Sequence, residues 1–176
     1  MSKKVRRYFL KEKETKKFLE ETLQKLKLNL KQILKDKVKI EIVETEFAEI
    51  YLINGKPLLA SSGEHVFPTL VFSEALALAP KIVVDMGAVP HVCNGANVMA
   101  PGIVRVEGYF KEDDFVLVVD ERHGKPIAIG EALKNVEEVN KARKGVVVKN
   151  VHYVGDKVWR LIKRLKTIDT NLTVKS

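Results

Sequence analysis

The chain has 176 residues, 45% of them hydrophobic, so it is long enough to bury a core and its composition is not that of a disordered protein. Its single cysteine, Cys93, excludes an internal disulfide and a zinc site made of several cysteines, and we expect a cytoplasmic protein. No stretch has the apolar length that a membrane-spanning helix needs, so we expect no membrane partner.

The formal net charge of +8 is distributed unevenly along the chain. Residues 1–40 contain 14 Lys and Arg against 5 Asp and Glu, residues 41–140 contain 7 against 16, and residues 141–166 contain 9 against 1. Two basic segments therefore enclose an acidic one, and a basic surface is typical of a protein that binds a polyanion. In the N-terminal block, where Glu is interleaved, the alternative explanation is the abundant surface lysine of a thermophilic protein.

The first part of the chain predicts a helix that begins near Glu12. Leucines recur there at spacings of four, three and four, which places them on one side of the helix. These leucines are Leu19, Leu23, Leu26 and Leu30.

Strands follow this helix. Alternating or apolar residues at 38–44 and 48–53 predict two of them, and Asn54-Gly55 predicts a tight hairpin turn into a third over residues 56–60. Pro68 predicts the first turn of a short helix. The first 78 residues therefore predict a small α+β domain.

The most informative stretch comes next. A β-branched run at 82–84 predicts a buried strand, and the carboxylate of Asp85 is placed to cap a short helix over residues 86–93. Asn94-Gly95 predicts the end of that helix, because both residues tolerate a left-handed backbone. Pro101-Gly102 then predicts a sharp turn.

Short strands with turn signals between them continue the chain, at 103–106, 115–119, 126–133 and 146–151. Their regular spacing predicts a small β-barrel. Gly130 lies inside the third of these strands, which indicates a bulge or the close approach of another backbone. Residues 158–162 predict a last strand or short helix, and residues 167–176 predict a flexible tail.

Four of these motifs, in their order, resemble the start of a PUA domain, a small RNA-binding β-barrel. They are Asp-x-Gly-Ala at 85–88, Asn-Gly-Ala-Asn at 94–97, Pro101-Gly102, and Val-x-Val at 104–106. The later strands continue the pattern, so the resemblance covers about residues 80–155.

The run Asn150-Val151-His152-Tyr153 is similar to the family of the malignant-T-cell-amplified translation factor. Members of that family carry a distinct N-terminal domain before the PUA module. The resemblance implies a pre-PUA domain over residues 1–78 and a PUA barrel over residues 79–166, followed by the tail. The lysine-rich, cysteine-poor composition suggests an archaeal member.

The resemblance also implies a binding site. In PUA domains the helix and glycine loop between the first two strands contribute to the RNA-docking surface, which here implies Gly95, Ala96, Asn97, Met99 and Gly102. Small residues also let another backbone come close, because no Cβ blocks the approach. The alternative for the glycines is that they only allow tight turns of the barrel.

Basic residues supply the second part of the predicted site. Arg105 either donates to a phosphate or pairs with an acid such as Glu107. Seven further cations predict phosphate contacts, which position an RNA without reading its sequence; they are Lys141, Arg143, Lys144, Lys149, Arg160, Lys163 and Arg164. We expect the glycine loop and this basic segment to form one RNA-binding surface.

No catalytic constellation is evident. His91 and Cys93 lack a third partner, and their spacing on a helix would point the side chains apart. The four histidines show no metal-ligand spacing, so we expect no metal, no cofactor and no enzymatic activity. Tyr153 and Trp159 could stack on a base, but packing in a core is the commoner role of such residues.

The resemblance implies a non-enzymatic RNA-binding protein of translation, whose partners would be the acceptor end of a transfer RNA and the small ribosomal subunit, during initiation or recycling. In that family a partner with an initiation-factor-like domain binds the N-terminal domain. Two alternatives stay open. One is an accessory subunit that holds RNA for a separate RNA-modification enzyme, and the other is a protein–protein adaptor that uses the acidic middle segment.

Overall fold

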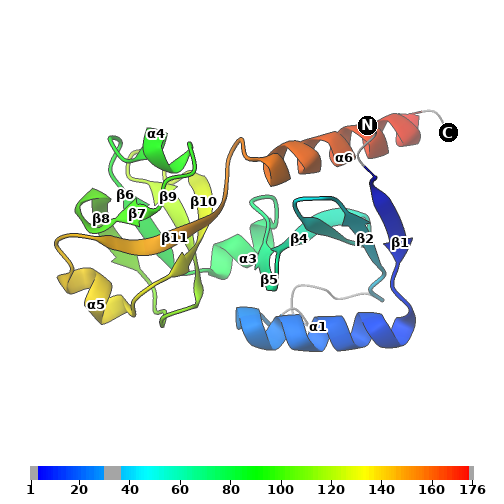
Figure 1. Cartoon of the computed structure of the whole chain (residues 1–176), viewed down its shortest axis with the longest axis horizontal. Coiled ribbons are helices and arrows are strands. Elements are labelled where there is room, and N and C mark those ends of the chain that lie inside the picture. The colour runs from blue at the N-terminus through cyan, green and yellow to red at the C-terminus, as the bar shows by residue number, and fades with distance from the viewer. Residues whose placement is uncertain (1–3, 30–36, 175–176) are drawn as a thin grey trace. The chain divides into compact units, whose positions relative to one another are not determined.

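The computed structural model describes residues 4–29 and 37–174 (Figure 1). The chain forms two compact units. Unit 1 contains Met1–Ala75 and Arg160–Ser176, and unit 2 contains Leu76–Trp159. The sequence placed residues 160–166 with the barrel, whereas these residues cluster with the N-terminal part of the chain.

Unit 1 is built on an antiparallel sheet of five strands in the order β1-β2-β3-β4-β5. Its strands are β1 (Arg6–Phe9), β2 (Ile40–Glu44), β3 (Glu49–Ile53), β4 (Lys56–Ser62) and β5 (His65–Pro68). Asn54 and Gly55 join β3 to β4 with φ angles of 50° and 84°, the left-handed backbone that a two-residue hairpin turn requires. The predicted hairpin is therefore confirmed.

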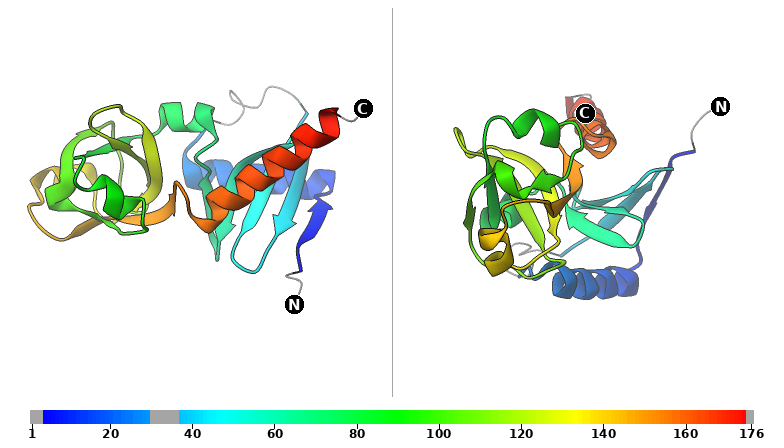
Figure 2. Two further views of the ribbon diagram at one scale, coloured as in Figure 1. Left: turned by 90° about the horizontal axis from the view of Figure 1, so that it is seen from above. Right: turned by 60° about the vertical axis from the view of Figure 1, so that its left-hand side comes forward.

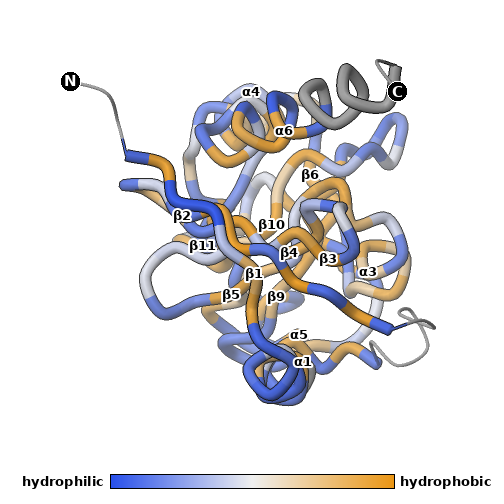
Figure 3. The backbone as a smooth tube through the Cα atoms, turned by 90° about the vertical axis from the view of Figure 1, so that its right-hand side faces the viewer, coloured by the Kyte–Doolittle hydropathy of each residue, from blue (hydrophilic) through white to orange (hydrophobic). Residues whose placement is uncertain are grey.

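Two helices lie on opposite faces of this sheet, α1 (Glu12–Leu26) and α6 (Lys157–Val174) (Figure 2). Helix α1 is largely hydrophilic (Figure 3), and Phe18 stacks on Tyr51 of β3 with ring centroids 4.5 Å apart. Of the four predicted leucines, Leu26 is buried and Leu19 half-buried. Leu30 and the side chain of Leu23 lie outside the described residues.

The prediction of a helix starting at Pro68 is wrong. Pro68 is the last residue of β5, and the backbone N–H of Thr69 still donates to the carbonyl of Leu58 in β4. The helix that follows, α3, spans Ser73–Leu78. Proline is compatible with both a first helical turn and a strand end, and the pairing with β4 decides between them.

Helix α6 replaces the predicted strand or short helix and much of the predicted tail, because it continues to Val174. Val158, Ile162 and Leu165 are buried at spacings of four and three, which is the period of a helix. Asp156 precedes the helix, and its Oδ1 accepts a hydrogen bond from the backbone N–H of Trp159 at 2.7 Å, as an N-cap does.

Unit 2 is a curled sheet of six strands in the order β7-β11-β10-β9-β6-β8. All neighbouring pairs are antiparallel except β6 and β9. The strands are β6 (Lys81–Val84), β7 (Val98–Met99), β8 (Ile103–Glu107), β9 (Phe115–Asp120), β10 (Pro126–Ala132) and β11 (Val146–Tyr153). Three short helices complete the unit, α4 (Val89–Val92), the 3-10 helix η1 (Ala100–Gly102) and α5 (Val136–Lys141). The predicted small barrel, and with it the α+β class, is confirmed.

The barrel has one apolar core, to which Ile82, Val116, Ala128 and Val148 contribute. The register between β10 and β11 shifts at Gly130, and a Cβ at Gly130 would collide with the side chain of Val148. The predicted bulge with a close approach is therefore confirmed. The curl of the sheet brings the loops after β6 against strand β11.

Candidate nucleic-acid interface

A surface pocket of about 420 Å³ lies beside α4 and η1 in unit 2. Its lining is Asp85, Ala88, His91, Val92, Ala96, Asn97, Val98, Met99, Pro101 and Gly102. Four of the five predicted loop residues, all except Gly95, are in this lining. The pocket therefore lies where the sequence placed the RNA-docking surface.

Asp85 shapes one side of the pocket. Its backbone N–H donates to the carbonyl of Gly102 at 2.9 Å, and its Oδ1 accepts from the backbone N–H of Ala88 at 2.8 Å. Asp85 therefore accepts from a backbone N–H that follows it, as predicted, but it does not cap the helix. Helix α4 is shorter than predicted, begins at Val89, and has Ala88 at its N-cap without a side-chain hydrogen bond. A Cβ on Gly102 would lie 3.2 Å from the Cβ of Ala88, so a glycine lets the two ends of the loop meet.

Gly95 shapes the other side. Its φ angle of 94° is the left-handed conformation in which a helix commonly ends, as predicted. A Cβ at this position would lie 3.2 Å from the ring carbon Cε1 and 3.2 Å from the hydroxyl oxygen of Tyr153. Tyr153 packs against the barrel core as well, so its ring serves packing and supports the turn rather than standing open to a base.

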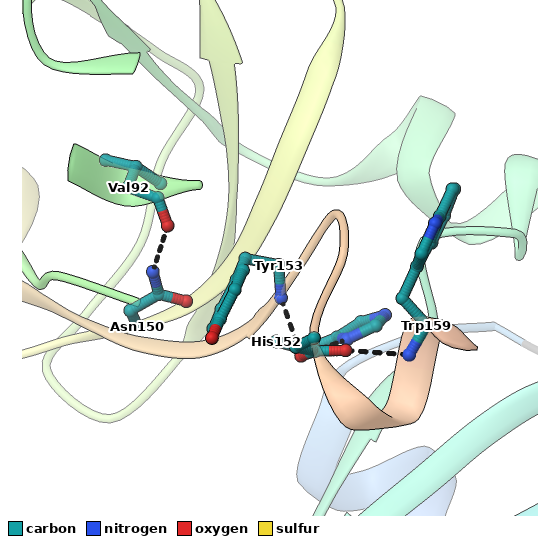
Figure 4. Close-up of polar contacts among 6 residues, drawn as sticks. Val92, Asn150, His152, Tyr153 and Trp159 are labelled. Atoms are coloured by element: carbon teal, nitrogen blue, oxygen red, sulfur yellow. Dashed lines mark hydrogen bonds and ion pairs between the residues drawn. The ribbon is translucent and has the colours of Figure 1, made fainter. Parts of the chain in front are cut away.

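Asn150 of β11 ties the same loop to the sheet. Its Nδ2 donates to the carbonyl oxygens of Val92 at 3.0 Å (Figure 4) and Ala96 at 2.9 Å. Its backbone N–H donates to Oδ1 of Asn97 at 2.9 Å. Sequence reasoning did not assign Asn150 to the site, and the only signal was its place in the family-like run at 150–153.

Basic residues continue from the pocket along the same unit. The carbonyl of Gly145 accepts a hydrogen bond from the backbone N–H of Ala100 at 2.9 Å, and Val146 pairs with Met99 across the β7–β11 ladder. The exposed side chains that flank this junction are Lys141, Arg143, Lys144 and Lys149. We call these four residues the basic edge.

The remaining predicted cations lie elsewhere. Arg105 is on β8, an edge strand, and its Nε lies 3.1 Å from Oε1 of Glu107 on the same strand, with both side chains about half exposed. Arg160, Lys163 and Arg164 are exposed on α6 and belong to unit 1.

The family models divide the chain in the same way as the fold. The PUA domain family matches residues 80–154, and a domain of unknown function, DUF1947, matches residues 6–73. An uncharacterized protein of Methanocaldococcus jannaschii is 44% identical over 155 residues, which cover 88% of this chain and 95% of that protein.

Two further relatives carry names. Translation machinery-associated protein 20 of Schizosaccharomyces pombe is 30% identical over 76% of this chain and 80% of its own length. Malignant T-cell-amplified sequence 1 of Rattus norvegicus is 30% identical over 75% of this chain and 76% of its own length. The chain belongs to the family of these two proteins.

Solved structures of archaeal proteins share the family's fold. A hypothetical protein of Pyrococcus horikoshii has a TM-score of 0.75 and 35% identity, over 89% of this chain and 99% of that chain. A PUA domain protein of Aeropyrum pernix also has a TM-score of 0.75, with 26% identity over 92% of this chain and 93% of that chain. The expected PUA family and the archaeal character are thereby confirmed.

Neither Cys93 nor His152 has the surroundings of an activated catalytic group. Burial raises the pKa of the Cys93 thiol, which is the opposite of what a reactive thiolate needs. His152 is fully buried in a packed position, with Nδ1 2.8 Å from Oδ2 of Asp156. Among the described residues no group of three His, Cys, Asp or Glu could hold a metal ion, and no helix there could cross a membrane.

Proposed function

We propose that this family member binds structured RNA during translation and that its pocket receives an unpaired RNA end. The observation that carries the proposal is the pairing of Val146 with Met99, which joins the basic edge to a pocket lined by small residues. Phosphates and a nucleotide can then be held on one surface of unit 2.

The pocket suits a single nucleotide. Its volume of about 420 Å³ falls within the range of small-molecule sites. The lining combines apolar contacts, such as Met99, with the polar groups of Asp85 and Asn97. Small exposed residues at the rim, such as Ala96, let a ribose–phosphate backbone come close. RNA-binding proteins recognise sequence mainly in such unstacked ends and loops.

The basic edge supplies the attraction. Exposed Lys and Arg neutralise phosphates and release counterions, so affinity for RNA should fall steeply with salt. Arg105 contributes less in this proposal, because Glu107 already balances its charge. Arg160, Lys163 and Arg164 would form a further phosphate contact on unit 1.

The RNA we propose is transfer RNA, and the unpaired end is its acceptor end. One of the relatives is a translation machinery-associated protein, which supports the small ribosomal subunit as the place of action, in initiation or recycling. The proposal involves no catalytic step.

The test is the binding of transfer RNA, with and without its single-stranded 3′ end, across a series of salt concentrations. We expect tighter binding of the intact molecule and a steep negative slope of log K against log salt. A charge-reversal variant, Lys141→Glu with Arg143→Glu and Lys144→Glu, should flatten that slope. The control is Lys37→Glu with Lys39→Glu and Lys56→Glu, which makes the same charge change at exposed positions of unit 1.

Weak binding that is insensitive to salt would contradict the proposal. Sedimentation with small ribosomal subunits tests the proposed place of action. Association with a modification enzyme instead of ribosomes would favour the accessory-subunit alternative, and unchanged RNA binding in the charge-reversal variant would favour the adaptor.

A further inference from the structure

A single side chain on β11 holds the pocket loop from behind. Both N–H groups of the Asn150 amide donate to main-chain carbonyls, those of Val92 and Ala96, and the Asn150 backbone N–H holds the side chain of Asn97. All three partners line the pocket. The contact therefore fixes the end of α4 and the start of the following loop at once.

The orientation of the Asn150 amide follows from its neighbours. The two neighbours of the amide, from Val92 and Ala96, are carbonyl oxygens, so only the NH₂ side of the amide can face them. The amide oxygen, Oδ1, is buried and accepts no hydrogen bond from the described residues. A buried acceptor without a donor opposes folding, whereas the two hydrogen bonds that the amide donates stabilise the loop. An apolar side chain would remove the first effect but would also leave the carbonyls of Val92 and Ala96 without this donor.

The bond from Asn150 also sets the direction of the Asn97 amide. Its Oδ1 faces the backbone of β11, so its Nδ2 is the polar group that remains, on an exposed residue of the pocket lining. Within the described chain this nitrogen donates to no other group. Asn97 therefore offers a ligand the donor Nδ2, while its acceptor Oδ1 is already bonded to Asn150.

We propose that Asn150 is a positioning residue for RNA recognition. It holds the loop and orients Asn97, so that Nδ2 of Asn97 donates to an acceptor atom of the unpaired nucleotide in the pocket. This inference rests on the proposed function, because it assigns roles within the same pocket. It predicts a preference for RNA with an unpaired end that depends on both asparagines.

The test compares two RNAs, a hairpin with a short unpaired 3′ end and the same hairpin with a blunt end. The preference is the ratio of the two affinities. In Asn150→Ala we expect the preference to fall about tenfold, while the salt slope on the blunt hairpin stays unchanged because no cation is lost. A role confined to folding would weaken binding of both RNAs alike.

A second variant acts directly on the donor. Asn97→Asp keeps the oxygen that accepts from Asn150 and replaces the Nδ2 donor by an oxygen, so we expect a similar loss of preference with the melting temperature retained. The control for the added negative charge is Asn140→Asp, at an exposed position on α5. This control should weaken the binding of both hairpins equally and so leave the preference unchanged.

Each outcome either supports or overturns the inference about the two asparagines. If the wild type binds both hairpins equally, or if either variant keeps the wild-type preference, the inference is overturned while RNA binding itself stands. If the wild type binds neither hairpin nor transfer RNA, the proposed function fails first. If Asn150→Ala does not fold, Asn97→Asp decides alone, because its loss of preference supports the inference and its retention overturns it.

Discussion

The Nδ1 atom of buried His152 lies 2.8 Å from Oδ2 of Asp156, and this carboxylate also accepts the backbone N–H groups of Tyr153 and Trp159 (Figure 4). One side chain thus joins the last strand of the barrel to the first turn of α6. Asp156 is only partly exposed, so the removal of its carboxylate would leave these donors without their acceptor.

We expect Asp156→Ala to lower the free energy of unfolding by about 2–4 kcal/mol, since it removes an N-cap and leaves His152 without its carboxylate. Urea denaturation measures the change. Asp156→Asn should lose less, because an amide oxygen can still accept from Trp159. A loss no larger than that of an exposed control, Glu64→Ala, would show that the carboxylate is not structural.

The same carboxylate makes stability depend on pH. Burial, the largest influence, raises the pKa of Asp156, but the hydrogen bond and charge of His152 and the N–H groups of Trp159 and Tyr153 together lower the pKa below the ordinary value of 3.8. Between the folded and the ordinary pKa the unfolded chain binds more protons. This stabilisation is therefore complete above pH 3.8 and is lost as the pH falls towards the folded pKa.

Denaturation at a series of pH values from about 5 to 2 measures this effect. Asp120 acts in the same direction, because the backbone N–H of His123 holds the pKa of its carboxyl below the usual value. Asp156→Asn should flatten part of the acid limb and leave the part due to Asp120. An identical acid limb in wild type and Asp156→Asn would contradict the assignment.

Gly95 and Gly155 make a matched pair, since their φ angles are 94° and 95°. Of the two, only Gly95 has neighbours in the way of a Cβ, namely Cε1 and the hydroxyl oxygen of Tyr153 at 3.2 Å, whereas Gly155 has nothing within 4 Å. We expect Gly155→Ala to cost about 1 kcal/mol for the backbone conformation. Gly95→Ala should cost about 1–2 kcal/mol more.

Thermal or urea unfolding of the two variants measures that difference. Equal losses would show that the loop around Gly95 shifts away from Tyr153 without cost. The expected larger loss would confirm that the ring of Tyr153 supports the pocket loop by contact.

Gly130 lies at the register shift between strands β10 and β11. A Cβ there would collide with Val148 and lie 3.1 Å from the carbonyl oxygen of Lys149, so we expect Gly130→Ala to destabilise unit 2 by about 1–3 kcal/mol. Combining it with Val148→Ala should recover part of the loss, because the collision is then relieved. Without any recovery in the double variant, the bulge itself and not the side-chain collision would be the reason for the glycine.

The sequence by itself determined the features whose causes are local. Asn54-Gly55 allows a tight turn wherever it occurs, Asp85 can accept from a backbone N–H that follows it, and alternating strands predict a barrel. The motif order was also enough to locate the loop that lines the pocket. Pro68 alone does not decide its own structure, because a proline is equally compatible with a strand end and a helix start.

Only the tertiary structure decided how that loop is held. Asn150 reaches Val92 and Ala96 across 58 and 54 positions of the chain, and Gly95 meets the ring of Tyr153 in the same way. Such contacts exist only once the sheet curls and brings β11 behind the loop, and no periodicity along the chain records them. Hydrophobic spacing follows from the geometry of one element, whereas the partner of a polar side chain depends on how separate elements pack.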